Sequence, residues 1–347
     1  MIETPVYPTL PSALEASEPP EARGLGRDGV RLLVGRRATD EVSHHAFREL
    51  PRLLREGDVV VVNTSATLPA AVPVVGGDLT VHFSAAWPDQ SELGRSWLVE
   101  LRRVHNGATV PFAGAVVGEE YGLPGGASIQ LLSPYSEGRL WIASVQAGVG
   151  VVEYLQRYGT PIRYGYVHRS WPLAYYQTVF GREPGSAEMP SAGRPFTHAM
   201  VTELVTSGVV VVPVLLHTGV ASPEAHERPY PEWFAVSAAT ARTINQRRAG
   251  GGRIIAIGTT VVRALESAVE PDGLVRACAG RTELVVTPQS GVRAVDALLT
   301  GLHEPAASHL DMLAAIAWRP LLDACYAAAA SHGYLWHEFG DVNLLLP

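Results

Sequence analysis

The strongest chemical signal in the sequence is an apolar stretch that ends at Gly258 and is followed by two hydroxyl residues, Thr259 and Thr260. This pattern predicts a strand, a tight turn and the first turn of a helix. Backbone N–H groups at such a helix start can hold a carboxylate, a phosphate or a ribose hydroxyl. The alternative is that one of the threonines is only the N-cap of the helix. The spacing leaves both interpretations open.

Arg263 and Glu266 follow on the same predicted helix. They are three residues apart, so their side chains share one face of that helix. We take both as candidate catalytic residues. The alternative is an ordinary surface ion pair, which would contribute little to stability.

A second signal is His217, which follows the apolar run 209–216 and precedes Gly219. A histidine at the end of a buried strand suits proton transfer because its pKa can lie near neutrality. Gly219 would allow a ligand to approach the backbone closely. A structural histidine with satisfied hydrogen bonds is the alternative.

A third signal is a loop of small residues ahead of the helix predicted at 198–207, preceded by an aromatic pair and an amide. Loops of this kind often bind ligands, and aromatic faces can hold a base. The alternatives are a plain connector and aromatic rings that only pack. The candidates are Tyr176, Gln177, Thr178, Ser191, Ala192 and Gly193.

Metal and covalent-amine chemistry are not expected. The 12 histidines fit no zinc or metalloprotease spacing. Cys278 and Cys325 are too few and too distant for a disulfide framework or a thiolate site. All 27 basic residues are arginines, which removes Schiff-base and P-loop lysines from consideration.

The elements that must position these residues predict an α/β fold with two domains, as the length of 347 residues suggests. Residues 1–65 and 151–347 are expected to form a large α/β domain, a sheet covered by helices. Residues 66–150 alternate in short strands and predict an inserted small antiparallel β-barrel. Ligands of such α/β sheets favour the loops after the carboxyl ends of the strands, here 216–222 and 258–260.

Within the large domain, apolar periodicity predicts helices and strands in alternation. The strands are expected at 32–34, 59–62, 209–216, 253–257 and 283–286. The helices are expected at 44–54, 151–157, 198–207, 238–248, 260–268, 308–317 and 321–332.

Charge and hydropathy limit the class of protein. The net charge of −7 argues against a protein that holds nucleic acid mainly through bulk positive charge, although a local basic patch stays possible. No apolar run approaches the roughly 20 residues that cross a bilayer. We therefore expect a cytoplasmic protein without a membrane partner, and the oligomeric state stays open.

Taken in order, these motifs resemble the S-adenosylmethionine:tRNA ribosyltransferase-isomerase family over nearly the whole chain. The G-T-T-x-x-R-x-L-E-S run and the Y-Q-T-V run are the most specific. The matching stretches are 31–33, 53–64, 176–180, 190–193, 216–219, 255–267, 295–305, 310–313 and 339–341.

The resemblance implies a fold of the kind described above and a metal-independent reaction. Such enzymes transfer the ribosyl part of S-adenosylmethionine to 7-aminomethyl-7-deazaguanine in a tRNA anticodon, and adenine and methionine are released. The implied catalytic residues are His217, Arg263 and Glu266. The residues implied for binding are Tyr176, Gln177, Thr178, Ser191, Ala192, Gly193, Gly219, Gly258, Thr259, Thr260, His303 and Asp341.

The sequence departs from the family pattern mainly at cationic positions. Where the family reads N-D-T-R-V-I-P-A-R, residues 63–71 lack both arginines, and residues 300–308 lack the lysine of T-N-F-H-L-P-K-S-T. Phosphate contacts depend on such charges. Two alternatives therefore stay open, namely a small-molecule acceptor without tRNA and a binding protein without catalytic activity.

Overall fold

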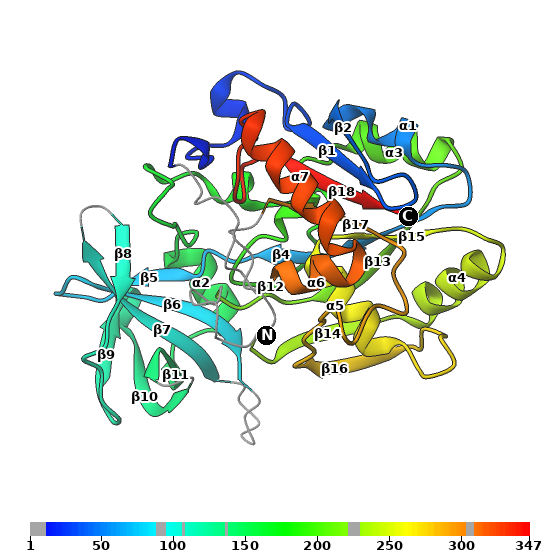
Figure 1. Ribbon diagram of the computed structural model, residues 1–347. Helices are drawn as coiled ribbons and strands as arrows, with labels where there is room; N and C mark the ends of the chain where they lie inside the picture. The colour runs from blue at the N-terminus through cyan, green and yellow to red at the C-terminus, as the bar shows by residue number, and fades with distance from the viewer. Residues whose placement is uncertain (1–11, 88–94, 106–107, 136–137, 221–229, 303–308) are drawn as a thin grey trace.

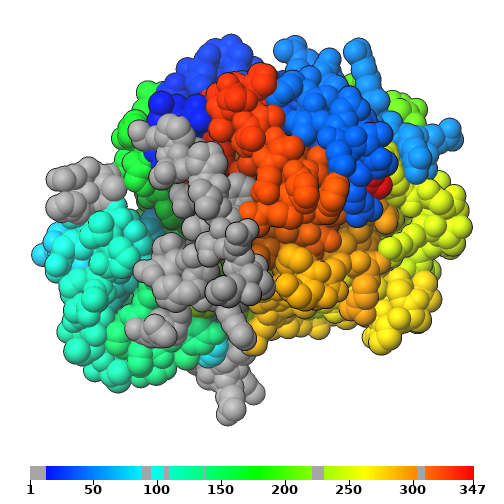
Figure 2. All heavy atoms as spheres, in the orientation of Figure 1, coloured from blue at the N-terminus to red at the C-terminus, as the bar shows by residue number. Residues whose placement is uncertain are grey.

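The computed structural model describes residues 12–87, 95–105, 108–135, 138–220, 230–302 and 309–347. Its two main parts are a large mixed sheet flanked by helices and a smaller antiparallel sheet beside it (Figure 1). The space-filling view shows the smaller sheet as a lobe next to the larger body (Figure 2).

The large sheet has nine strands in the order β16-β14-β13-β3-β15-β17-β18-β1-β2. Its centre is parallel, since β13, β3, β15 and β17 run side by side in one direction. The strands are β1 (Arg31–Arg36), β2 (Glu41–Ala46), β3 (Val59–Asn63), β13 (Val210–Leu216), β14 (Glu232–Val236), β15 (Ile254–Ile257), β16 (Cys278–Thr282), β17 (Ala297–Gly301) and β18 (Val342–Leu346).

Alternate residues of the central strands pack into separate cores on the two faces. In β3, Val59 and Val61 belong to one core, while Val60 and Val62 belong to the other. Burial on both faces requires an unbroken apolar run, and each buried valine contributes about 1.5–3 kcal/mol. The first core contains α4 (Ala238–Ala249), α5 (Thr259–Ala268), α6 (His309–Ile316) and α7 (Arg319–Ser331), and the second contains α1 (Leu50–Leu53) and α3 (His198–Thr206).

The smaller sheet is antiparallel throughout and barrel-like. Phe83, Val99 and Ile129 lie in its interior core. The sheet nearly closes where the amide of Val75, just after β5, donates to Gly122 of β9 at 2.9 Å. Its strands are β5 (Ala71–Pro73), β6 (Leu79–Ala86), β7 (Ser96–His105), β8 (Ala108–Pro111), β9 (Glu120–Leu123), β10 (Ala127–Tyr135) and β11 (Leu140–Gln146).

The chain leaves this sheet through α2 (Val151–Tyr158), whose end is tied to β5. Ala71 and Thr160 exchange two backbone hydrogen bonds of 2.9 Å each. Gly159 permits this approach, because a Cβ there would lie 1.9 Å from the carbonyl oxygen of Pro69. A parallel pair, β4 (Ser65–Thr67) with β12 (Glu183–Ser186), forms a separate small sheet.

The mixed α/β class and the antiparallel barrel-like sheet expected from the sequence are confirmed, whereas the domain limits at 66 and 150 stay a prediction. Two element assignments were wrong. The helix expected over 44–54 begins only at Phe47, as a 3-10 turn (Phe47–Glu49) that continues into α1, because Glu41–Ala46 pairs with β1 as an edge strand. The strand expected at 283–286 is irregular, because the ladder with β14 ends at Thr282. Among the described residues, no helix is long and apolar enough to span a membrane.

Candidate active site

A pocket of about 120 Å³, partly open to solvent, lies where β13 and β15 end and α5 begins. This is the edge at which parallel α/β sheets usually bind ligands. Apolar, hydroxyl and charged side chains all contribute to its wall. The lining residues are Glu188, Thr218, Gly219, Val220, Tyr230, Glu232, Thr259, Thr260, Arg263, Leu284, Val285, Val286, His309 and Met312.

The start of α5 forms one wall of this pocket. Gly258 adopts φ +93°, a conformation that side chains rarely tolerate, and its ideal Cβ would lie 3.4 Å from Ala192. Gly258 itself is the N-cap, so neither threonine caps the helix, contrary to the alternative considered above. Among the described residues, no hydrogen-bond acceptor is recorded for the amides of Thr259 and Thr260. These amides, at the positive end of the helix dipole, are available to an anionic group.

Asn63, the last residue of β3, holds the turn before α5 in place through its side chain. The Asn63 carboxamide accepts a hydrogen bond from the amide of Leu216 at 3.0 Å and donates to the carbonyl of the same residue at 2.8 Å. Its Nδ2 also lies 3.3 Å from Oγ1 of Thr260. The ends of β3 and β13 and the first turn of α5 are thereby held together.

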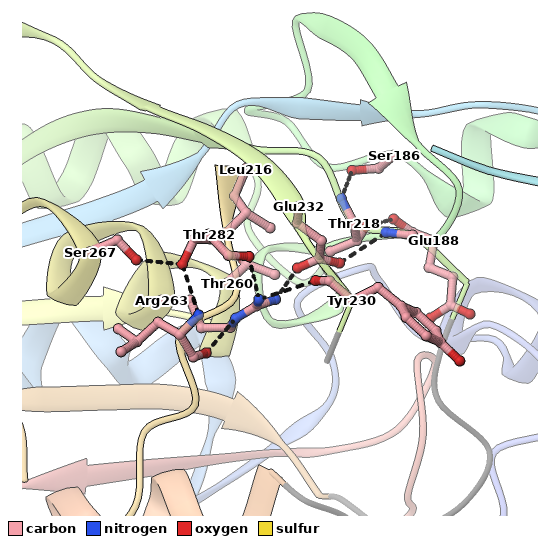
Figure 3. Close-up of polar contacts among 12 residues, drawn as sticks. Ser186, Glu188, Leu216, Thr218, Tyr230, Glu232, Thr260, Arg263, Ser267 and Thr282 are labelled. Atoms are coloured by element: carbon pink, nitrogen blue, oxygen red, sulfur yellow. Dashed lines mark hydrogen bonds and ion pairs between the residues drawn. The ribbon is translucent and has the colours of Figure 1, made fainter. Parts of the chain in front are cut away.

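Arg263 lies beneath the pocket and is not at the surface, being 7% exposed. Its guanidinium forms an ion pair with Glu232 and donates to the carbonyls of Leu284 at 3.2 Å and Thr282 at 3.1 Å (Figure 3). The other carboxylate oxygen of Glu232 accepts from the amide of Gly219 at 2.9 Å. Burial raises the pKa of Glu232, while Arg263 and that amide oppose the rise. The pair therefore joins four segments of the pocket wall.

Glu266 is 6% exposed and does not pair with Arg263. Its carboxylate accepts hydrogen bonds of 2.8–2.9 Å from the amides of Arg293 and Ala294. Burial raises the pKa of Glu266, and these bonds partly oppose that shift. The surface ion pair considered from the sequence is therefore wrong. Glu266 anchors the chain before β17 and is not among the residues that line the pocket.

His217 directly follows β13, but its imidazole is not part of the pocket wall. Nδ1 lies 2.8 Å from Oγ of Ser65, which in turn lies 2.6 Å from Oγ of Ser186. Gly185 packs directly against the ring, where a Cβ would approach within 2.4 Å. Burial lowers the pKa of His217, and Glu183 opposes the shift. The residues that follow His217, from Thr218 to Val220, do line the pocket.

The remaining candidates lie outside the pocket wall. Gln177 uses its side chain to bond both backbone groups of Thr67, at 3.0 and 2.8 Å. Buried Tyr176 packs against Phe339, with ring centroids 5.2 Å apart, and burial raises its pKa. A Cβ on Gly193 would lie 3.4 Å from the side chain of Thr178.

Asp341 and Ser191 line a second, smaller hollow. The Asp341 carboxylate accepts from Arg31 at 2.8 Å and from the amide of Leu335 at 2.8 Å, so it anchors the chain before β18. His303 lies outside the described residues.

Most of the polar residues of the pocket wall, including Glu188, Glu232 and Tyr230, were not predicted from the sequence. His309, one of the histidines whose spacing fits no metal motif, lines the pocket, and burial with the nearby charge of Arg263 lowers its pKa to about 4. No motif marks Glu232, because its partner is a helix residue 31 positions away. Within the described ranges, no group of three or more histidine, cysteine, aspartate or glutamate side chains could hold a metal ion.

Comparisons with known proteins agree with one another. A family model described as "Queuosine biosynthesis protein" matches residues 7–345. A Geobacter metallireducens protein named S-adenosylmethionine:tRNA ribosyltransferase-isomerase is 34% identical, with 96% of each chain aligned. A Moorella thermoacetica protein of the same name is also 34% identical, with 97% of each chain aligned. The crystal structure of S-adenosylmethionine tRNA ribosyltransferase from Thermotoga maritima matches with a TM-score of 0.54 and 26% identity, over 98% of this chain and 99% of that one.

Proposed function

This chain belongs to the queuosine biosynthesis protein family, and from that premise we propose that it is an S-adenosylmethionine:tRNA ribosyltransferase-isomerase. The observation that carries the proposal is the pocket at the start of α5, built by the same run, 255–267, that resembles the family most closely. The donor substrate is S-adenosylmethionine and the acceptor is 7-aminomethyl-7-deazaguanine in a tRNA anticodon. No metal takes part in the proposed reaction.

The pocket offers complementary groups for each part of the donor. The amides of Thr259 and Thr260 suit the methionine carboxylate, because they point from the positive end of α5. Leu284, Val286 and Met312 provide apolar surface for the nucleoside. Arg263 is already bound to protein acceptors, so we propose that it positions the wall through Glu232 and the carbonyls that it holds.

The chemistry requires a proton acceptor near the sulfonium. The positive sulfur makes the adjacent C5′ protons acidic, so their removal can start the elimination that expels adenine. We propose His309 for this step, because its imidazole lines the pocket and is neutral at pH 7, which is the form that can accept a proton. The catalytic role of His217 stays a prediction, and its contacts with Ser65 suit a positioning role. The predicted roles of Tyr176, Gln177 and Asp341 in binding likewise stay predictions.

The proposal is tested by incubating the purified protein with S-adenosylmethionine, with and without tRNA that carries 7-aminomethyl-7-deazaguanine. Chromatography then measures adenine and methionine. Release of both that depends on the modified tRNA is the expected result. Release without tRNA would instead establish the small-molecule alternative, which the names of the aligned relatives do not favour. No release under either condition would contradict an enzymatic role.

A further inference from the structure

Three aromatic side chains form a row that runs from the pocket onto the smaller sheet. Tyr230 lines the pocket, its ring centroid lies 5.9 Å from that of Tyr135, and Tyr135 lies 5.1 Å from Trp87. All three side chains are partly exposed. We call Trp87, Tyr135 and Tyr230 the aromatic ledge. Trp87 directly follows β6, and Tyr135 is the last residue of β10 in the smaller sheet. Tyr230 lies just before β14, the strand that begins with Glu232.

An arginine accompanies each end of the aromatic ledge. The Arg139 guanidinium lies 5.5 Å from the centre of the Tyr230 ring and donates to its hydroxyl at 2.9 Å. At the other end, Arg281 lies 5.6 Å from the centre of the Trp87 ring, and its Nη2 donates to the carbonyl of Ala86 at 2.5 Å. Aromatic rings interleaved with guanidinium groups are typical of surfaces that bind single-stranded nucleic acid.

The charges around the aromatic ledge are modestly favourable to an anion. Glu100 is shared by two arginines, with Arg102 at 2.6 Å and Arg139 at 3.4 Å, so this group carries one excess positive charge. The exposed carboxylate of Glu283 lies near Tyr135 and contributes to the raised pKa of that phenol. Binding at this surface would therefore depend more on stacking than on attraction of phosphates.

We propose that the aromatic ledge binds the unpaired nucleotides that flank the target base of the acceptor RNA. This proposal rests on the function proposed above. Because Tyr230 belongs to both the pocket and the aromatic ledge, a base that enters the pocket places its neighbours over Tyr135 and Trp87. Unpaired bases expose the faces that stack on aromatic rings, whereas paired bases do not. Stacking also accounts for RNA binding by a chain with a net charge of −7 and few motif arginines.

The test compares Trp87→Ala and Tyr135→Ala with two matched controls. Trp318→Ala and Tyr158→Ala remove aromatic rings that are 48% and 41% exposed and lie outside the aromatic ledge. The probe is an anticodon stem-loop RNA with unmodified guanine at the target position, titrated by fluorescence anisotropy. Each ledge variant is expected to bind this RNA roughly tenfold more weakly, and the controls are expected to bind as the wild type does. Calorimetry with S-adenosylmethionine should give the same affinity for every variant.

Alanine variants of Trp87 and Tyr135 that bind the RNA as tightly as the wild type would overturn the proposal, and so would an equal loss in the controls. If an alanine variant does not fold, Trp87→Phe keeps a ring and should retain most of the affinity, whereas Arg281→Ala should reduce the salt dependence of binding. Failure of the proposed function is separate, because the wild type would then release no adenine with the modified tRNA. An active wild type with unaffected ledge variants would refute only the aromatic ledge.

Discussion

Breaking the buried pair of Arg263 and Glu232 should destabilise both the fold and the pocket. Arg263→Met removes the positive partner and leaves the Glu232 carboxylate buried at 13% side-chain exposure, together with the carbonyls of Leu284 and Thr282. Loss of one partner of a buried ion pair typically costs about 3–5 kcal/mol. That is a large fraction of the roughly 5–15 kcal/mol that stabilises a typical domain. We therefore expect a folded variant with a much lower urea midpoint.

A double-mutant cycle separates the pair from its surroundings. Glu232→Gln should also destabilise the protein. The double variant with Arg263→Met should lose less free energy of unfolding than the two single variants added together, because neither charge is then buried alone. The control is Arg276→Ala, which breaks an exposed pair with Asp272 and should cost less than about 1 kcal/mol. Tryptophan fluorescence during urea unfolding measures stability, and calorimetry measures affinity for S-adenosylmethionine.

Two results would refute this reasoning. Single variants whose free energy of unfolding falls by less than about 1 kcal/mol would show that the pair is not effectively buried. Strictly additive losses in the double variant would show that Arg263 and Glu232 act independently. If Arg263→Met lost affinity for the donor without any loss of stability, Arg263 would instead bind the donor directly, as the sequence predicts.

Further predictions concern the proton acceptor, the turn before α5 and the response to pH. His309→Gln should bind S-adenosylmethionine but release no adenine, whereas His217→Gln should reduce adenine release only partly. Chromatography of adenine measures both, and a greater loss of release in His217→Gln than in His309→Gln would exchange their roles. Gly258→Ala should weaken donor binding and lower the urea midpoint, because φ +93° disfavours a side chain; an unchanged midpoint would contradict the strain. Burial and Arg102 lower the pKa of His82 to about 3, so the unfolded chain binds one more proton at this residue, and the contribution of His82 to stability should fall by about 1.4 kcal/mol per pH unit as pH drops from 6.5 towards 3. His82→Gln should flatten that slope in urea titrations at several pH values.

The sequence was informative where burial alone decides the structure. The runs that became β3, β13 and β15 are apolar on both faces, which only a covered parallel sheet requires. The turn at Gly258 was also predictable, since a glycine after such a strand and hydroxyl residues before a helix leave few other conformations. The edge strand β2 was not, because its residues are half exposed and carry no clear alternation.

The pocket wall could be predicted only in part, because side-chain partners are set by tertiary structure. Nothing in the sequence around His217 indicates that its ring contacts Ser65, 152 positions earlier. Arg263 was identified as important, but the one ionic partner considered for it, as an alternative, was its local neighbour Glu266 and not distant Glu232. Spacing of three residues shows which side chains share a helix face, and it cannot show which distant carboxylate reaches that face.

The two bonds between Ala71 and Thr160 also bear on how the protein behaves in concentrated solution. A strand with an unpaired edge is a template on which a second molecule can add its own strand, which leads to aggregation. β5 is short, β6 occupies one of its edges, and Thr160 occupies part of the other. Thr160 is 89 positions away from Ala71, so this edge stays uncovered until the segment after α2 has docked. Association between molecules should therefore be most frequent during refolding, before the segment after α2 has docked.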